Sequence, residues 1–386
     1  MASSSQIEWS CPECQVIIMD RRKFCDNCHS MLVWTCLSSE KSGLYAHYSR
    51  HRDRCDYCSP ELKEEREQLK KEKQISNFQE LQTLYVDQRP WSEWSRSNDS
   101  CIQHTGHDIE QVQLLYNMCE QSLIEYCTNR KQQCSSSTKM PYLSPINLLS
   151  ITLWYLKHYH SERYIATEFD FTQSTVSYFL SAVIDILYSC VYPKLIVLPD
   201  DMDDEDAVHG SEQHHKLIVD STFIPIYQPE DSEERKAYYH AKSPTNYAFK
   251  LQIACDFHHR VVHVSECYKG SVHDITILRE SGLLDCTQEN VQIIADKGYI
   301  DEQYVITPRK KPRGRELTTE DKDFNRIICG ERAAIENINQ RVKQYAILGH
   351  VYRGSYDDLH KITKIAHVVC ALCNLNLDKH LIRSYR

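Results

Sequence analysis

The sequence has no long apolar run and no apolar leader. Its first six residues, Met1–Gln6, are mostly small and polar, so they predict no signal peptide. No stretch approaches the ~20 apolar residues that a membrane-spanning helix requires, and we therefore expect no membrane partner. These absences predict a reducing compartment. The 18 cysteines are then interpreted as metal ligands or small buried residues rather than as a disulfide framework.

The sequence also lacks a glycine-rich phosphate loop and an excess of positive charge. Without such a loop, hydrolysis of nucleoside triphosphates is disfavoured. The net charge of −9 by itself argues against a nucleic-acid partner. Much of the acidity, however, lies in one run, Asp200–Asp206, which we interpret as a solvated linker. Basic stretches elsewhere can still form a local surface that faces DNA.

Length and composition predict more than one folded domain. The chain has 386 residues, which allows two or three domains of roughly 100–200 residues each. Hydrophobic residues make up 41% and charged residues 26% of the sequence. These fractions are ordinary for a protein with a substantial hydrophobic core.

Four cysteines near the N-terminus have the spacing of a structural zinc site. Cys11 and Cys14 form one Cys-x-x-Cys pair, and Cys25 and Cys28 form a second one after a short basic turn. Each pair can place two thiolates on one tetrahedral Zn²⁺, so the two pairs together close a four-cysteine site. The alternative interpretation is four unrelated buried thiols.

A second group of cysteines and histidines follows directly. His51, Cys55 and Cys58 can bind a second zinc ion together with either His47 or Cys36. His47 and His51 lie one helical turn apart, which would put both imidazoles on one face. The alternative is a set of surface histidines beside an isolated cysteine pair.

The middle of the chain is predicted to be helical. The residues Glu61–Tyr85 predict an exposed connecting helix, and further helices are expected over Ile109–Cys127 and from Pro145 through Tyr155. Next, Glu162–Phe169 and Thr172–Leu180 place apolar residues at helical spacing around a tight turn.

These last two helices have the pattern of a helix-turn-helix, whose second helix lays polar N-terminal residues into the major groove of DNA. Gln173, Ser174 and Thr175 would contact base edges or phosphates, together with Arg163. An ordinary helical hairpin is the alternative.

The C-terminal half changes to strands. The runs Lys216–Thr222, Tyr247–Cys255, Val261–Glu266 and Val291–Ala295 are strand-like, and a helix is expected from Gly270 onward. This order of strands and helices predicts a mixed sheet flanked by helices.

Two of these strands are expected to end at or just before an acidic residue. Asp220 is expected at the end of the first strand, Asp296 follows the fourth, and Glu336 lies in a predicted helix over Glu331–Ala346. Converging carboxylates bind hard cations such as Mg²⁺ or Mn²⁺. Two such ions ~4 Å apart can activate a water or 3′-hydroxyl and stabilise the leaving oxygen of a phosphodiester. Asp274 is either an auxiliary acid or the acidic member of a capping box that begins at Ser271.

Basic residues lie near these acids in the sequence. Arg332 and Lys343 flank Glu336 and can hold a phosphate there. A basic run is interpreted as a loop over the phosphate backbone, with a solvated loop or a nuclear-import signal as alternatives. The run comprises Arg309, Lys310, Lys311, Arg313 and Arg315. In the expected closing helix, Asp358–Lys379, Cys370 and Cys373 are interpreted as buried core thiols.

Taken together, these residues resemble the PIF/Harbinger-type transposases of the DDE superfamily, in the group called DDE superfamily endonuclease 4. The resemblance covers roughly Pro141–Asn376. The matching segments are Val219–Thr222, Lys269–Asp274, Ala295–Tyr299 and Ile335–Asn337, preceded by the helix-turn-helix.

The resemblance implies an RNase H-like fold with a mixed five-stranded sheet. It implies Asp220, Asp296 and Glu336 as the catalytic triad and Asp274 as a further metal ligand. Arg332, Glu336 and Lys343 are also similar to an Arg-x3-Glu-x6-Lys signature of bacterial insertion-sequence transposases. Cys329 departs from that signature, which has a Tyr at this position.

The activity implied by the resemblance is cut-and-paste transposition at terminal inverted repeats, with a separate Myb-like partner protein in many such elements. We therefore predict a nuclear, metal-dependent DNA endonuclease and transposase that acts on double-stranded DNA, and we count a second copy of the chain among its candidate partners. One alternative is a domesticated DNA-binding protein that has lost transposition. Another is an RNase H-like nuclease acting in repair or on RNA, which the helix-turn-helix disfavours.

The expected organisation has five parts. Residues 1–60 form a zinc-binding region and residues 61–140 a helical, polar linker region. Residues 141–198 form the helix-turn-helix domain, residues 199–213 the acidic linker, and residues 214–380 the endonuclease domain.

Overall fold

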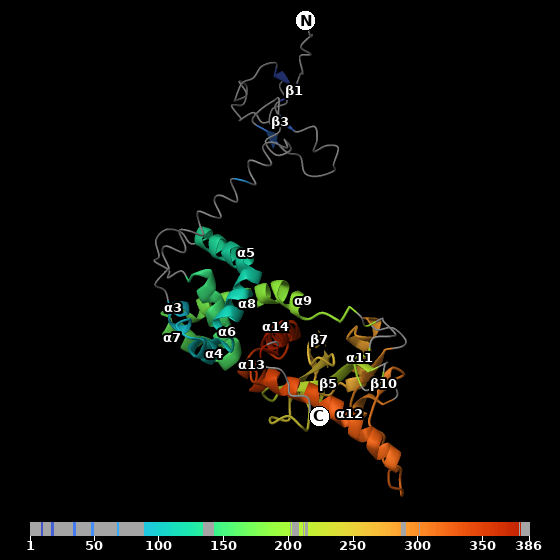
Figure 1. Cartoon of the computed structure of the whole chain (residues 1–386). Helices are drawn as coiled ribbons and strands as arrows, with labels where there is room; N and C mark the ends of the chain where they lie inside the picture. Colours follow the sequence, from blue (N-terminus) through green and yellow to red (C-terminus); the bar gives the residue numbers. More distant parts are fainter. Residues whose placement is uncertain are drawn as a thin grey trace. The chain divides into compact units, whose positions relative to one another are not determined.

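The chain divides into two compact units, Met1–Thr83 and Leu84–Arg386. A computed structural model (Figure 1) describes residues 89–133, 143–200, 215–286, 291–300 and 302–377. It also describes residues 68, 202, 208–210, 212 and 379, and four short strands in the first unit. These strands form two antiparallel pairs, β1 (Trp9–Ser10) with β2 (Ile17–Ile18) and β3 (Trp34–Thr35) with β4 (Tyr48–Ser49).

All predicted zinc ligands lie outside the described residues. They are Cys11, Cys14, Cys25, Cys28, Cys36, His47, His51, Cys55 and Cys58.

The second unit begins with a group of helices. Four of them start at a Ser or Thr whose side-chain oxygen accepts a backbone N–H of the first turn, as at Ser161 and Thr172. The predicted helix-turn-helix segments are both helical. The helices are α3 (Trp91–Trp94), α4 (Asn98–Thr105), α5 (Ile109–Gln133), α6 (Pro145–His158), α7 (Glu162–Glu168), α8 (Gln173–Cys190) and α9 (Tyr192–Leu195).

Helix α8 is strongly apolar. By length and composition alone, Gln173–Leu195 could cross a membrane, and it is the one such stretch among the described residues. However, Val176, Phe179, Val183 and Leu187 on α8 are buried, and the helix packs against α5, α6, α7 and α14. An apolar stripe covered by neighbouring helices is what a core helix requires.

A six-stranded mixed sheet follows, in the order β10-β9-β5-β6-β7 with β8 paired to β6. β9 is parallel to both β5 and β10, whereas β6 is antiparallel to β5, β7 and β8. The strands are β5 (His215–Pro225), β6 (Ala248–Cys255), β7 (Val261–Val264), β8 (Tyr268–Lys269), β9 (Gln292–Ile294) and β10 (Val305–Ile306).

The mixed α/β architecture is as predicted, but the expected number of five strands was wrong. Strands β8 and β10 have two residues each. A two-residue strand is too short to show an alternating hydrophobic pattern, so only its partner strand reveals it.

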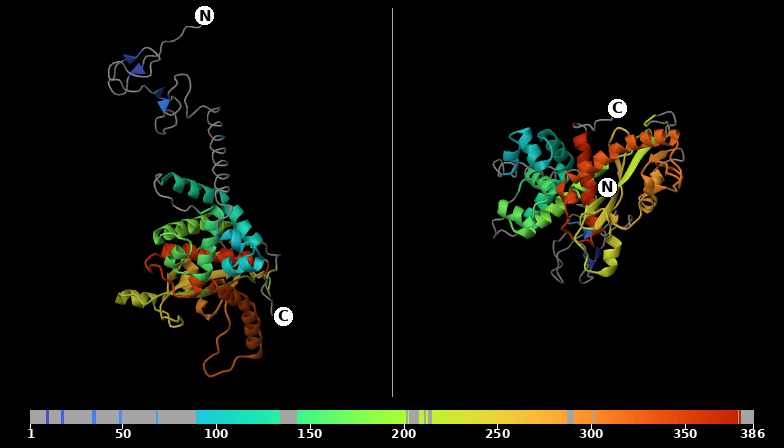
Figure 2. Two further views of the ribbon diagram at one scale, coloured as in Figure 1. Left: turned by 90° about the vertical axis from the view of Figure 1, so that its left-hand side faces the viewer. Right: turned by 90° about the horizontal axis from the view of Figure 1, so that it is seen from below.

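Helices cover both faces of the sheet. α11 (Asp274–Glu280) buries Leu278 against Val219 and Ala254 on one face. α12 (Thr319–Lys343) contacts β5, β6 and β9, and α14 (Leu359–Leu377) contacts β7 as well as α8 and α9. Figure 1 shows α14 between the helical group and the sheet, while the long α12 runs along the sheet and extends past it. The left view of Figure 2 shows the same extension of α12. Shorter helical segments complete the fold: α10 (Ser232–Tyr238), η1 (Leu284–Cys286), η2 (Lys297–Tyr299) and α13 (Ala346–Gly349).

Helix α12 begins twelve residues before the predicted start at Glu331. Its first turn has a capping box, in which Thr318 accepts the N–H of Asp321 and the Asp321 carboxylate accepts the N–H of Thr318. The first turns of the helix are mostly polar and exposed, so hydrophobic periodicity gave no indication of its start.

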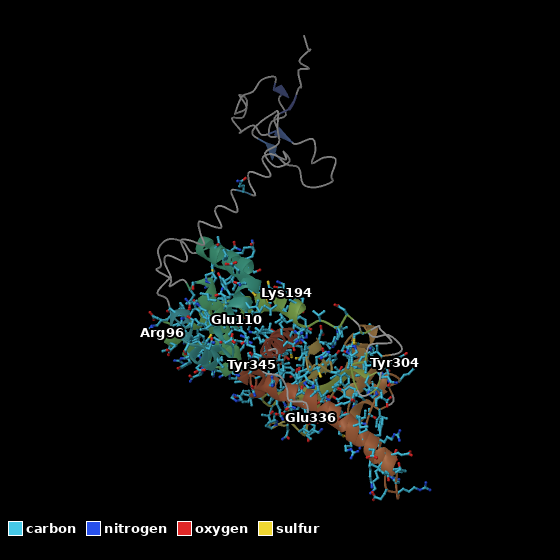
Figure 3. The ribbon with its side chains drawn as sticks, in the orientation of Figure 1. Arg96, Glu110, Lys194, Tyr304, Glu336 and Tyr345 are labelled. Atoms are coloured by element: carbon cyan, nitrogen blue, oxygen red, sulfur yellow. The ribbon has the colours of Figure 1, made fainter. Side chains whose placement is uncertain are left out.

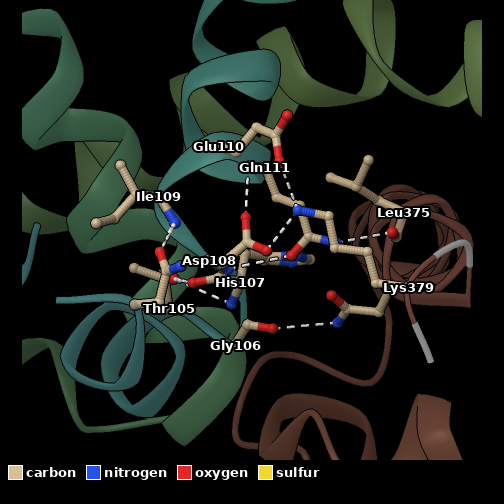
Figure 4. Close-up of polar contacts among 11 residues, drawn as sticks. Thr105, Gly106, His107, Asp108, Ile109, Glu110, Gln111, Leu375 and Lys379 are labelled. Carbon is tan, nitrogen blue, oxygen red and sulfur yellow. Dashed lines mark hydrogen bonds and ion pairs between the residues drawn. The ribbon is translucent and has the colours of Figure 1, made fainter.

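The end of α14 is tied to the turn between α4 and α5 (Figure 4). Gln111 donates its side-chain N–H to the carbonyl of Leu375 at 2.8 Å, and Asn376 donates to the carbonyl of Gly106 at 3.1 Å. Lys379 pairs with Asp108 at 2.6 Å. These contacts join residues more than 260 positions apart and help to hold the helical group and the sheet in one unit.

Gln111 provides a test of this joint. It is 5% exposed, and its Oε1 also accepts the backbone N–H of Asp108. We expect Gln111→Leu to lower the free energy of unfolding by about 1–3 kcal/mol, because the Leu375 carbonyl and the partly buried Asp108 N–H lose their partners. Urea denaturation measures this. The exposed Gln113→Leu on the same helix should change it by no more than about 0.5 kcal/mol, and equal effects of the two would contradict the assignment.

Candidate active site

Asp220 lies in the middle of β5, not at its end as the sequence predicted. Leu217, Ile218 and Val219 are buried, and β5 continues to Pro225 because it pairs with β6 over that whole length. The parallel partner β9 behaves differently. It pairs Ile294 with Ile218 and then leaves the sheet. Asp220 is therefore two residues beyond the last β5–β9 pair.

Asp296 occupies the matching position on the other strand, two residues past Ile294. It caps the short helix η2, and its Oδ1 accepts the N–H of Gly298 at 2.6 Å. The two predicted acids thus flank the point where β9 leaves the sheet, the arrangement that the sequence order suggested.

Asp274 reaches the same point from α11. A Cβ atom on Gly298 would lie 2.8 Å from Asp296 Oδ1 and 2.9 Å from Asp274 Oδ2. Both carboxylates therefore converge on the backbone of Gly298, and a side chain at this position would clash with them. The glycine therefore leaves room for the two acids at their present positions, and a larger residue would displace at least one of them.

The alternative role of Asp274 in a capping box was wrong. Helix α11 begins at Asp274 itself, with His273 as N-cap and no side-chain capping hydrogen bond. Instead, Asp274 Oδ1 lies 3.2 Å from the ammonium of Lys250, a buried residue of β6. Nothing in the sequence indicated Lys250, because 24 residues separate it from Asp274 and its strand shows only the usual alternation of side chains.

Two residues of α12 contact Asp220. Asn339 Nδ2 donates to Asp220 Oδ2 at 3.0 Å, and a guanidinium nitrogen of Arg332 lies 3.9 Å from Asp220 Oδ1. Arg332 is one of the predicted site residues, whereas Asn339 was missed. The two are seven residues apart, two helical turns, so they share one face of α12.

The pKa of Asp220 is raised to about 6, chiefly by burial; the charges of Asp296 and Asp274 contribute in the same direction, while Arg332 opposes the shift. The three aspartates are thus close enough to influence one another electrostatically. A partly buried carboxylate beside two others is stabilised either by a proton or by a cation.

Glu336 lies between Arg332 and Asn339 on α12, and Figure 3 labels it beside the sheet. It is four residues after Arg332 and three before Asn339, so helical spacing puts it on the face that contacts Asp220. Its side chain is exposed. Lys343 follows at the same spacing, at the end of the helix.

A second network braces the site from the α11 face. The hydroxyl of Tyr299 lies 3.0 Å from Ser221 Oγ and accepts the Gln252 Nε2 hydrogen at 3.0 Å. Gln252 is fully buried and also lies 3.3 Å from the carbonyl of Asp274. Strand alternation puts Ser221 and Gln252 on the face opposite to Asp220. The network therefore fixes η2 and α11, which carry Asp296 and Asp274.

The donor atoms fit a hard divalent cation. Among the described residues, the buried Asn339 Oδ1 beside Asp220 accepts no hydrogen bond, and Asp296 Oδ1 and Asp274 Oδ2 lie 2.8 and 2.9 Å from the position of a Cβ on Gly298. Carboxylate and carboxamide oxygens are the ligands that Mg²⁺ and Mn²⁺ prefer. Within the same described part of the chain, no group of three or more His, Cys, Asp or Glu side chains is already closed around one point. Closure would require Asp220, Asp274, Asp296 and Glu336 to rotate toward a common ion.

The comparisons with known proteins agree with this geometry. Residues 219–374 match the family model described as DDE superfamily endonuclease. This stretch of the chain, which includes Asp220, Asp274 and Asp296, is therefore similar to the DDE superfamily endonucleases. A Microchaete diplosiphon protein named "probable transposase for insertion sequence element IS702" is 27% identical over 213 residues, which are 53% of this chain and 72% of that protein. The matched region begins one residue before Asp220 and ends inside α14.

The basic run of the endonuclease domain lies against the exposed half of α12. Arg309 forms an ion pair with Asp321 at 2.6 Å, and its guanidinium lies 4.6 Å from the ring centre of Phe324. Lys311 is paired with Glu316. The loop is thus attached to the helix, and two of its five predicted DNA-contacting residues already have acidic partners. Lys310, Arg313 and Arg315 are also exposed.

Of the DNA-contacting residues predicted for a helix-turn-helix, Gln173, Ser174 and Thr175 lie at the start of α8 and Arg163 lies on α7. Gln173 and Ser174 are exposed, as is Arg163 on α7. Thr175 is less accessible, since its N–H donates to the Thr172 cap and its hydroxyl lies 2.9 Å from the Thr172 hydroxyl. The structure adds Tyr178, which is 71% exposed one turn further along α8.

Proposed function

We propose that this protein is a Harbinger-type DDE transposase, a metal-dependent endonuclease that cuts double-stranded DNA at terminal inverted repeats and joins the new ends to target DNA. The observation that carries the proposal is that Asp274 and Asp296 meet at Gly298, where β9 leaves the sheet, close enough to Asp220 to raise its pKa. Glu336 lies on the face of α12 that contacts Asp220. Bound there, two Mg²⁺ or Mn²⁺ ions would supply activation of the attacking oxygen and stabilisation of the leaving oxygen.

Each residue of the site has a role in this proposal. Asp220, Asp274, Asp296 and Glu336 are the ligands of the divalent cations. Asn339 fixes the orientation of Asp220 through Oδ2, while Oδ1 lies 3.9 Å from a guanidinium nitrogen of Arg332. Arg332, 15% exposed in its side chain, offsets the charge of Asp220, and with Lys343 it can bind the phosphate of the substrate.

The DNA-binding surfaces follow from the exposed polar and basic residues. We propose that α8 reads base edges through Gln173, Ser174 and Tyr178, and that Lys310, Arg313 and Arg315 contact phosphates. The acids Glu168 and Asp170 lie beside the start of α8 and oppose nonspecific binding there. Recognition by α8 therefore depends on specific contacts rather than on charge.

Substitutions on α8 test this surface. We expect Gln173→Ala and Tyr178→Ala each to weaken binding of the element's terminal repeat by about 1–3 kcal/mol. Melting temperatures should not change, because both side chains are exposed. Fluorescence anisotropy on labelled duplex measures affinity. Tyr227→Ala is the matched control, since Tyr227 is 64% exposed in the endonuclease domain, and equal loss from the control would argue against α8 as the reading helix.

The proposal extends to the regions outside the described residues. The two Cys-x-x-Cys pairs support a structural zinc ion, and metal analysis of the folded chain should then find at least one zinc per molecule. The family resemblance supports a nuclear location, a Myb-like partner and assembly with a second copy. A fluorescent fusion and light scattering test location and assembly, and co-purification tests the partner.

The decisive experiment for the enzyme is a nicking assay. Full-length protein is incubated with a labelled terminal-repeat duplex and Mn²⁺ or Mg²⁺, and in parallel with EDTA. Cleavage that requires the metal is the expected result. A protein that binds the duplex but never cuts it would favour the alternative, a domesticated transposase-derived DNA-binding protein without transposition activity.

A further inference from the structure

Lys250 is a buried cation inside the acid site. It is 5% exposed in the middle of the sheet, where an unpaired ammonium is costly. Its Nζ lies 3.2 Å from Asp274 Oδ1 and donates to the carbonyl of Val272 at 2.6 Å. It also lies 5.5 Å from the ring centre of Phe223. The ammonium is therefore held at one position by three separate contacts.

The charge of Lys250 complements that of Arg332. Strand alternation puts Lys250 on the face of the sheet opposite to Asp220, because Ile253 is the cross-strand neighbour of Asp220. Arg332 lies beside Asp220 on the α12 face, and Lys250 lies beside Asp274 on the α11 face. The acids are thus compensated by one cation from each face.

The contact also orients Asp274. Lys250 binds Oδ1, whereas Oδ2 lies on the side of Gly298 and Asp296. One carboxylate oxygen is therefore held by the protein and the other is presented to the site. This arrangement favours coordination of a cation through a single oxygen.

We propose that Lys250 is a positioning residue that acts as the internal counter-cation of the DDE site. It fixes Asp274 so that only Oδ2 is available to a divalent ion, and its positive charge competes with that ion for Asp274. The inference rests on the proposed metal-dependent function. Removing the charge of Lys250 should strengthen metal binding and slow the reaction, whereas removing a purely structural lysine would not strengthen metal binding.

Calorimetric titration of full-length protein with Mn²⁺, without DNA, tests the proposal. Lys250→Met keeps the aliphatic stem but removes the charge, so we expect Mn²⁺ to bind roughly threefold to tenfold more tightly. Nicking by the same variant should fall by about tenfold or more, as for other residues that orient a ligand. In an Asp274→Asn background, Lys250→Met should no longer change the affinity for Mn²⁺.

Lys250→Arg provides a second test of the Mn²⁺ affinity if the Met variant does not fold. A guanidinium can bind both carboxylate oxygens at once, which would withdraw Oδ2, so Mn²⁺ should bind more weakly. The exposed Lys361→Met should leave the affinity for Mn²⁺ unchanged. The proposal is overturned if Lys250→Met binds Mn²⁺ no more tightly than wild type. It is also overturned if a folded Lys250→Arg protein binds Mn²⁺ as tightly as wild type or more tightly. Wild-type protein that neither binds Mn²⁺ nor nicks DNA overturns the enzymatic function itself, and the inference with it.

Discussion

Asp220→Asn is expected to lower the rate of metal-dependent nicking on the order of 10³-fold, because the variant loses the negative oxygen of a metal ligand and with it several kcal/mol of catalysis. Asparagine keeps the size of the side chain and can still accept the hydrogen bond from Asn339. The loss should therefore be chemical and not structural. Single-turnover cleavage of the terminal-repeat duplex, with the affinity for DNA measured separately, distinguishes the two.

The same substitution should stabilise the metal-free protein. Burial and the neighbouring acids raise the pKa of Asp220 to about 6 in the folded state, above its ordinary value of about 4. A carboxyl group with a raised pKa costs stability when it is ionised, at pH values above 6, and costs nothing once it is protonated below about pH 4. Asp220→Asn should thus be more stable by up to about 2 kcal/mol at pH 7, and this gain should vanish as the pH falls from 6 to 4.

Asp185→Asn is the control for this experiment. Asp185 is an exposed residue of α8 that pairs with Lys364, and its replacement should change stability by no more than about 0.5 kcal/mol. It should leave nicking unchanged. An Asp220→Asn protein that cleaves at the wild-type rate would remove Asp220 from the active site, and one that is less stable than wild type at pH 7 would contradict the electrostatic account.

Glu336→Gln is expected to reduce nicking by about 10²–10³-fold, the effect of losing one charged ligand of the catalytic ions. Glu336 is exposed, so the free energy of unfolding should stay within about 0.5 kcal/mol of wild type. Binding of the terminal repeat should also be retained. The activity loss would show that α12 supplies a ligand when the site closes, although the carboxylate is open to solvent in the free protein.

A matched control is available on the same helix. Glu320→Gln changes an exposed glutamate in the first turn of α12, far along the helix from Asp220. Full activity in the Glu320 variant and a large loss in the Glu336 variant would show that the loss of nicking depends on where the glutamate lies on α12. Full activity in both would leave the three aspartates as the complete ligand set and exclude Glu336 from the triad.

Several features of the site were predictable because their signals are local. Leu217, Ile218 and Val219 precede Asp220, and a similar apolar run precedes Asp296, so each acid could be assigned to a buried strand. The same holds for α7 and α8, where Ser161 and Thr172 provide N-caps. The capping box at Thr318 was also present in the sequence, and it is the signal that would have extended α12 to its true start.

The remaining features depend on strand register and helix docking. Whether Asp220 lies at a strand end depends on where β9 stops pairing, which nothing in β5 itself encodes. The contacts of Asp274 with Lys250 and of Asp220 with Asn339 join residues 24 and 119 positions apart. They form only when β6 pairs with β5 and α12 packs across the sheet.

The sequence by itself therefore determined which acids this protein presents and the elements that carry them, because periodicity and capping act over a few residues. Only the tertiary structure decided which partners hold each acid. Buried charges are satisfied by whichever groups the fold brings within a few ångströms. In this domain those groups are Lys250 of β6, whose side chain lies on one face of the sheet, and Arg332 and Asn339 of α12, which covers the other face.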